Sequence, residues 1–91
     1  MTYVVLVSRT FQKAFHELPE QLQKNIRISL RGLKEDPHTA RAGYDIKMLV
    51  DTHPKKYRLR VGEYRIIYLI ENKEVKVINL MKREHGYSRV E

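Results

Sequence analysis

The stretch that decides the fold is residues 55–70, KKYRLRVGEYRIIYLI. In its first part, Tyr57–Val61, apolar and basic residues alternate, a period of two that is typical of a strand with one buried face. After Gly62 and Glu63, the segment 64–70 is apolar on both faces apart from one arginine and the tyrosine hydroxyls. We therefore predict a two-stranded hairpin whose second strand lies in the middle of a sheet, covered on both sides.

Three arginines of this hairpin are predicted to share one face of the sheet. A two-residue turn with glycine first pairs Val61 with Tyr64. The next pair is then Arg60 directly opposite Arg65, and Arg58 points to the same face because side chains alternate along a strand. Like charges placed directly across a strand pair are destabilising. The arrangement therefore indicates that something anionic binds this face.

The N-terminal part predicts one strand followed by two helices. Residues 2–7, TYVVLV, are β-branched and aromatic, as strands usually are. Apolar residues then recur every three or four positions on both sides of Pro19, which predicts a helical hairpin over residues 9–35. Ser8 is a suitable N-cap. The pair Asp36-Pro37 ends the second helix, because a residue before proline avoids helical backbone.

The C-terminal half predicts an antiparallel meander. Residues 37–46 form a connecting loop, residues 46–50 give a weak strand signal, and residues 75–81 form the last strand. The order of strand, helical hairpin and meander predicts an α+β fold, with helices on one face of a small twisted sheet and the other face or its rim open for binding. Its 91 residues are expected to form a single domain, 1–91.

The predicted register gathers further cations at one end of the sheet. A tight turn at residues 72–73 sets Tyr64 near Met81. Lys82 and Arg83 then lie at the end of the sheet where the hairpin turns. The tail adds Tyr87 near the same end.

The composition favours a polyanionic partner. The formal net charge is +7 and the sequence pI is about 9.8, which suits nucleic acid, an anionic membrane or an acidic protein. Solubility alone is the other interpretation of a basic surface. The absence of cysteine excludes disulfides and thiolate catalysis and fits a reducing compartment. The apolar run 3–7 is too short for a signal peptide or a membrane span, so we expect a cytoplasmic protein.

The common catalytic signatures are absent from the sequence: there is no phosphate-binding glycine loop, nucleophile elbow or zinc-protease motif. The four histidines lack metal-ligand spacing and have no cysteine partners, so we expect neither a metal site nor a cofactor. Each histidine taken alone is expected at the surface. His85 is the exception, because it lies between Arg83 and Tyr87.

What remains is a basic patch interleaved with tyrosines. Arginines hold phosphate oxygens through a fixed fork of donors, and tyrosines stack on bases. RNA cleavage needs no metal if a base activates the 2′-hydroxyl, cations stabilise the pentacovalent phosphate, and an acid protonates the 5′-oxygen. The alternative for Tyr57, Tyr64 and Tyr68 is a core-facing role. The patch comprises Lys47, Lys55, Lys56, Arg58, Arg60, Arg65, Lys82, Arg83, Tyr57, Tyr64 and Tyr87.

The chain resembles the RelE/ParE toxin superfamily, and in particular its RelE-like branch. The resemblance rests on YRLRVGEYRIIY, preceded by KML and followed by a last strand and KREHGY, and it covers nearly the whole chain. It implies a ribosome-dependent, metal-independent endoribonuclease (an mRNA interferase) that cuts mRNA in the ribosomal A site. It also implies a small RelB-like antitoxin as protein partner, with mRNA and the ribosome as the other partners.

Carried over residue by residue, the resemblance implies a catalytic set. Arg58 and Arg60 occupy the basic positions before the turn, where related enzymes often have lysine. Arg65 matches the arginine that contacts the scissile phosphate. Arg83 matches a late-strand arginine, and Tyr87 an acid–base or stacking tyrosine. Further RNA contacts are expected from Lys47, Lys55, Lys56, Lys82 and His85.

Two other functions are compatible with the same residues. One is a ParE-like toxin that inhibits DNA gyrase and cuts no RNA. The other is an RNA-binding module without catalysis, whose affinity would fall with salt by a slope of about −0.7 for each phosphate contact on a single strand.

Overall fold

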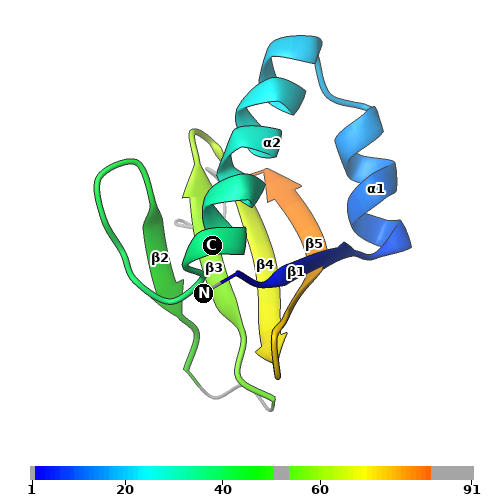
Figure 1. Cartoon of the computed structure of the whole chain (residues 1–91). Helices are drawn as coiled ribbons and strands as arrows, with labels where there is room; N and C mark the ends of the chain where they lie inside the picture. Colours follow the sequence, from blue (N-terminus) through cyan, green and yellow to red (C-terminus); the bar gives the residue numbers. More distant parts are fainter. Residues whose placement is uncertain (1, 51–53, 83–91) are drawn as a thin grey trace, which may run out of the picture.

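The structure is a computed structural model that describes residues 2–50 and 54–82. Within these residues it confirms the predicted α+β fold, with two helices packed on one face of an open, five-stranded sheet (Figure 1). The elements in chain order are β1 (Val4–Val7), α1 (Arg9–His16), α2 (Glu20–Glu35), β2 (Asp45–Met48), β3 (Tyr57–Val61), β4 (Tyr64–Glu71) and β5 (Glu74–Lys82).

The sheet is mixed, and its strand order over the described residues is β1-β5-β4-β3-β2. The strands from β2 to β5 form the predicted antiparallel meander, while β1 pairs with β5 in parallel. β4 lies in the middle of the sheet, as its apolar sequence predicts. The hairpin therefore forms the central part of the sheet, and the helices pack over one side of it.

The helical hairpin begins and ends where the sequence predicts. The Ser8 hydroxyl caps α1 by accepting a hydrogen bond of 3.0 Å from the Phe11 N–H, and it donates one of 2.8 Å to the Ile78 carbonyl. Pro19 is the N-cap of α2 and Asp36 its C-cap. Hydrogen bonds from the backbone of residues 38 and 39 lower the pKa of the Asp36 carboxyl. This side chain thus fixes the chain where it leaves the helix.

The core lies between the helices and the sheet. Ile26 and Leu33 of α2 are fully buried, as are Leu59 and Ile66 on the facing side of the hairpin. Tyr68 is also fully buried and donates a hydrogen bond of 2.7 Å from its hydroxyl to the Pro37 carbonyl. Burial raises the pKa of this hydroxyl. The predicted core-facing role is therefore confirmed for Tyr68, which is unsuited to proton transfer with a ligand on the open face.

The predicted register of the last strand was wrong by one residue. Tyr64 pairs with Lys82 and not with Met81, because the ladder shifts between Ile67 and Tyr68. Ile67 pairs with Asn79 and Tyr68 with Val77, which leaves Ile78 as the extra residue of a β-bulge. The carbonyl of this bulged residue accepts the bond from Ser8.

Two strand boundaries also differ from the prediction. The first strand begins at Val4 and not at residue 2, since the N–H of Tyr3 donates to the Lys34 carbonyl at 2.8 Å instead of joining the sheet. The strand predicted over 46–50 spans Asp45–Met48, and Val50 is 81% exposed. In the described residues, neither helix has the length and apolar character needed to cross a membrane.

Candidate RNA-binding face

The predicted arginine pair lies on the open face of the sheet, one residue pair from the hairpin turn at Gly62. Arg60 on β3 is directly opposite Arg65 on β4. Their neighbours Leu59 and Ile66 are buried under the helices, so the alternation of side chains turns both arginines to the opposite face. Asp45 is paired with Arg60 from the other side. Arg60 is exposed and Arg65 is half-buried.

Arg58 lies on the same face, one cross-strand row away. It is paired with Lys47 on β2 and with Ile67 on β4. Its Nη2 atom lies 3.5 Å from Oδ1 of Asp45, and its side chain is 16% exposed, against 57% for that aspartate. The ion pair holds the Arg58 guanidinium close to the sheet. These basic side chains form one continuous surface across three strands, which we call the basic face. It comprises Lys47, Arg58, Arg60 and Arg65.

A hollow of about 320 Å³ lies at the edge of this surface. The turn around Gly43 forms one side of it, and the hairpin turn at Gly62 forms the other. Both glycines have positive φ, +82° and +61°, which favours glycine at these tight turns. The Nε atom of Arg60 donates a hydrogen bond of 3.3 Å to the Gly62 carbonyl, so the side chain lies along the turn. Arg41, Tyr44, Asp45 and Arg60 also line the hollow.

The remaining predicted RNA-binding lysines do not all lie beside the arginines. Lys82 is at the same end of the sheet but is paired with Tyr64, which packs against the core on the helix-bearing side. Lys55 and Lys56 precede β3 and lie at the opposite end of that strand, about 17 Å and about 13 Å from Arg60 at the usual rise per residue. Only Lys47 belongs to the basic face. The RNA-binding role of all four lysines stays a prediction.

The tyrosines are mostly structural. Tyr57 stacks on the buried Tyr68 ring, with centroids 5.5 Å apart, and His38 contacts the Tyr57 ring edge-on at 5.8 Å. Tyr64 is half-buried and packs against the core. Their rings therefore lie on the helix side of the sheet, away from the basic face.

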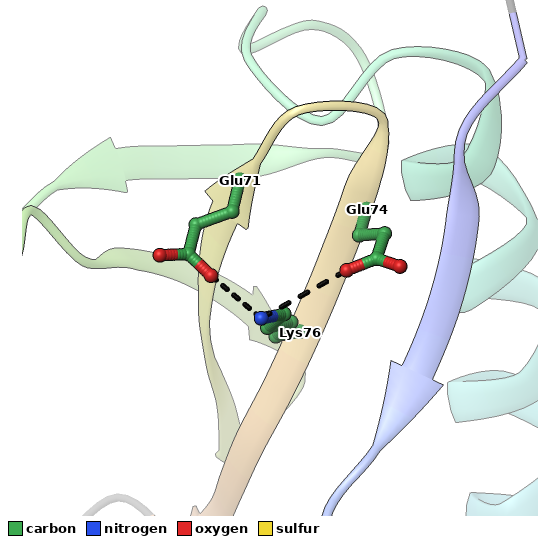
Figure 2. A network of polar contacts seen from close by, with 3 residues as sticks. All are labelled: Glu71, Glu74 and Lys76. Carbon is green, nitrogen blue, oxygen red and sulfur yellow. Dashed lines mark hydrogen bonds and ion pairs between the residues drawn. The ribbon is translucent and has the colours of Figure 1, made fainter.

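The other end of the open face carries a separate charge network (Figure 2). The Lys76 ammonium lies between two carboxylates, 2.6 Å from Glu71 and 3.8 Å from Glu74. The hydrogen bond to Glu71, followed by the charges of both glutamates, raises the pKa of Lys76. Since this cation already has two anionic partners, positive charge available to a polyanion is concentrated at the Gly62 end of the face.

Three predicted site residues, Arg83, Tyr87 and His85, lie outside the described residues, and their roles stay predictions. Within residues 2–50 and 54–82, there is no group of three or more histidine, aspartate or glutamate side chains placed to hold a metal ion. Because Tyr87 and His85 lie outside the described residues, the described part of the chain does not assign the catalytic acid and base.

Sequence reasoning missed two residues near the site. Asp45 had been placed in a loop, and its partner Arg58 becomes apparent only once β2 is paired with β3. The Arg41 guanidinium lies 4.2 Å from the centroid of the Tyr44 ring, and its Nη2 donates to the Gly32 carbonyl at 3.1 Å. The proximity of Arg41 and Tyr44 in sequence was the one signal available for this contact.

Comparisons with known proteins assign the family. The family described as ParE toxin of type II toxin-antitoxin system, parDE, matches residues 5–87. No match was found among curated proteins. Among solved structures, the archaeal RelE–RelB complex from Pyrococcus horikoshii OT3 contains a chain that is 29% identical, with a TM-score of 0.81, and the match covers 94% of this chain and 100% of that chain.

Two further structures share the fold. A chain of the toxin–antitoxin complex from Mycobacterium tuberculosis is 21% identical with a TM-score of 0.76, and covers 91% of this chain and 100% of its own. The isolated RelE toxin of E. coli is 23% identical with a TM-score of 0.71, and the match covers 94% of this chain and 92% of that chain. The chain therefore belongs to the ParE toxin family of type II toxin–antitoxin systems, within the RelE/ParE superfamily, and its structural neighbours are RelE-like.

Proposed function

We propose that this toxin is a ribosome-dependent endoribonuclease that cleaves mRNA in the ribosomal A site without a metal ion and so blocks translation. The observation that carries the proposal is the pairing of Arg60 with Arg65 on the open face, beside Arg58. A sheet does not gain stability from like charges placed directly opposite each other. The pairing is explained if a phosphate group lies between or above the two guanidinium groups.

The proposed chemistry is attack by the 2′-hydroxyl oxygen on the adjacent phosphorus. The new bond closes a cyclic phosphate, the bond from phosphorus to the 5′-oxygen breaks, and a proton passes from the 2′-hydroxyl to a base while an acid protonates the 5′-oxygen. Negative charge on the phosphate oxygens is highest in the pentacovalent transition state. A donor aimed at such charge contributes about 10²–10³ in rate.

The residues divide between stabilising the transition state and holding the RNA. Arg65, together with Arg83, would neutralise the phosphate oxygens. Arg58 and Arg60 would hold the RNA strand in line for attack, since the guanidinium fork binds two phosphate oxygens at once. Tyr87 would stack on a base or transfer a proton. The lysines of the patch and His85 would bind the backbone of the message or of ribosomal RNA.

The proposed protein partner is a RelB-like antitoxin that is expressed with the toxin in the cytoplasm. The support comes from the neighbours: the solved structures from Pyrococcus horikoshii and Methanococcus jannaschii are complexes of RelE with RelB. Neutralisation by such a partner would be measured by adding it to the assay below. Restored protein synthesis is the expected result.

The test is a translation extract to which the purified protein is added, followed by mapping of the mRNA 5′ ends. Cleavage phased with the codon in the A site, and absent from the same mRNA without ribosomes, is the expected result. Intact mRNA under conditions where translation stops would refute the ribonuclease.

A second candidate function is inhibition of DNA gyrase. It is favoured by the description of the matching family, which names ParE, and by arginine at both positions 58 and 60, which leaves no lysine there to act as a base. A supercoiling assay run in parallel separates the two. Loss of supercoiling together with intact mRNA would favour gyrase as the target.

A further inference from the structure

The hollow beside the basic face contains a group that phosphate binding alone does not explain. It has a volume of about 320 Å³ and lies where β2 begins, next to the turn between β3 and β4 (Figure 1). The carboxylate of Asp45 lines it together with the guanidinium groups of Arg41 and Arg60. An ionised carboxylate only accepts hydrogen bonds, and it repels phosphate. The hollow therefore favours an occupant that offers hydrogen-bond donors as well as acceptors.

Arg41 forms a flat and fixed wall of this hollow. Its Nη1 atom donates to the carbonyls of Asp36 and Thr39, and its Nη2 atom donates to the Gly32 carbonyl at 3.1 Å. The guanidinium also lies over the Tyr44 ring, 4.2 Å from its centroid, so the ring covers one of its faces. Because both Nη atoms are engaged within the protein, the group has its other face to offer to a ligand. Nucleobases stack on guanidinium planes of this kind.

Asp45 and Arg60 place an acceptor beside a donor on the other side of the hollow. The two residues are paired across β2 and β3, and both are exposed. Oδ1 of Asp45 lies 3.5 Å from Arg58, and Oδ2 has no hydrogen-bond partner among the described residues. The Nε atom of Arg60 donates to the Gly62 carbonyl, while its Nη atoms donate to no side chain or carbonyl in the described ranges. One carboxylate oxygen and two nitrogen donors thus remain for a ligand.

Among the four bases of RNA, guanine matches this pattern best. Its Watson–Crick edge carries two adjacent donors, the N1–H and the N2 amino group, next to the O6 acceptor. Two adjacent donors fit one carboxylate, and O6 fits an N–H of a guanidinium. Adenine and cytosine carry one donor group on this edge, and uracil carries a single N–H between two acceptors. Guanine therefore uses both the Asp45 carboxylate and the Arg60 guanidinium most fully.

We propose that the hollow binds a guanine base of the RNA strand whose phosphate lies on the basic face. The base stacks on Arg41, its N1–H and N2 amino group donate to Asp45, and its O6 accepts from Arg60. Since Arg60 belongs to the hollow and to the basic face, this guanosine is adjacent to the phosphate between Arg60 and Arg65. The inference rests on the proposed action on RNA and assigns a base preference to it.

The test is fluorescence anisotropy at low salt with short, labelled oligonucleotides that contain one guanine among uracils. Methylation of the 2′-oxygens removes the attacking hydroxyl and so prevents cleavage. In the comparison oligonucleotides, adenine or inosine replaces the guanine. Inosine keeps N1–H and O6 but lacks the N2 amino group, so it removes one donor to Asp45. We expect wild type to bind the guanine oligonucleotide about tenfold more tightly than either of the others.

A pair of variants separates base contact from the general effect of charge. Asp45→Asn should reduce the preference for guanine over inosine to less than about threefold. It also removes the ion pair with Arg58, but that loss alters the affinity for all the oligonucleotides alike and leaves their ratio unchanged. The matched control is Glu71→Gln, which makes the same change in net charge and also removes a carboxylate that is ion-paired, to Lys76. The control should keep the full preference.

Three results would overturn the guanine site. They are equal affinity of wild type for the three oligonucleotides, a guanine preference that survives Asp45→Asn, and equal loss of the preference in Asp45→Asn and Glu71→Gln. Absence of binding to every oligonucleotide would overturn it as well.

The fate of the proposed ribonuclease is decided separately, by mapping mRNA ends in a translation extract. Phased cleavage by a protein without a guanine preference would keep the ribonuclease and remove the guanine site alone. A guanine preference that depends on Asp45, in a protein that leaves mRNA intact, would keep the site and remove the ribonuclease.

Discussion

The pairing of Arg60 with Arg65 makes a prediction about stability and activity together. Replacing Arg60 with glutamine removes one charge from a like-charge pair and should reduce cleavage strongly while leaving the fold as stable as before. Ordinary surface substitutions also leave stability unchanged. What distinguishes this one is that a change without structural cost is expected to abolish most of the activity.

The stability change can be worked from the contacts of Arg60. Two unit charges about 6 Å apart in water repel by about 0.7 kcal/mol, and physiological salt reduces this to about 0.3 kcal/mol. Relief of that repulsion stabilises the variant, and loss of the attraction between Arg60 and Asp45, its cross-strand partner on β2, offsets the gain by a similar amount. The lost hydrogen bond from Arg60 Nε to the Gly62 carbonyl, 3.3 Å long and exposed, offsets it by about 0.5 kcal/mol. The free energy of unfolding should therefore change by less than about 1 kcal/mol.

The rate of cleavage should fall by about 10²-fold, because displacing a reacting group by about 1 Å lowers the rate by roughly that factor. The slope of RNA affinity against salt should also lose about 0.7, the contribution of one phosphate contact. The assay is mapping and quantifying mRNA ends in a translation extract, alongside urea denaturation.

The matched control is Lys76→Gln, which removes one charge from the same face at its other end, where Glu71 and Glu74 already bind the ammonium. It should retain cleavage. Equal loss of activity in both variants, or unfolding of the Arg60 variant, would refute the assignment of Arg60 to RNA positioning.

Three further predictions concern the scaffold. Ser8→Ala removes a cap bond from the Phe11 N–H and a bond to Ile78, and should lower the free energy of unfolding by about 2 kcal/mol in urea denaturation; a change near zero would contradict this. Tyr68→Phe should cost about 1 kcal/mol at neutral pH. Because burial raises the pKa of the Tyr68 hydroxyl, its protonated form is favoured in the folded state, so wild-type stability is full below about pH 10 and declines above it. The phenylalanine variant should lose less stability than wild type between neutral and strongly alkaline pH, and parallel curves would contradict this. Gly32→Ala should destabilise by about 1–3 kcal/mol in the same denaturation assay, because the new methyl would meet the Tyr44 ring; increased stability from better helix propensity would show that the ring moves freely.

Much of the fold was predictable because its signals are local. The alternation in β3, the apolar run of β4 and the glycine turn between them determine the hairpin, and the pairing of Arg60 with Arg65 was predicted correctly. Ser8, Pro19 and Asp36 marked the ends of the helices. Each of these signals depends on the chemistry of one residue or on a period of a few residues.

The features that were missed depend on contacts between distant parts of the chain. The bulge at Ile78 shifted the last strand by one residue, and the structure links it to Ser8, 70 positions earlier. The ion pair of Arg58 with Asp45 required the register of β2. The basic patch predicted from the sequence is spread over both faces and both ends of the sheet. The alternation of side chains along β5 places Lys82 on the helix side, and Lys55 precedes β3 at the end of the strand away from Arg60.

The central claim is that Arg65 acts on the scissile phosphate of ribosome-bound mRNA. The most direct measurement compares wild type, Arg65→Ala and a control, Lys24→Ala on the exposed side of α2, by mapping mRNA 5′ ends in a translation extract. Removal of a donor to the transition state should reduce codon-phased cleavage by about 10²–10³-fold in the Arg65 variant, with the control unchanged and all three proteins equally folded. Phased cleavage at the wild-type rate by a folded Arg65→Ala protein would contradict the account.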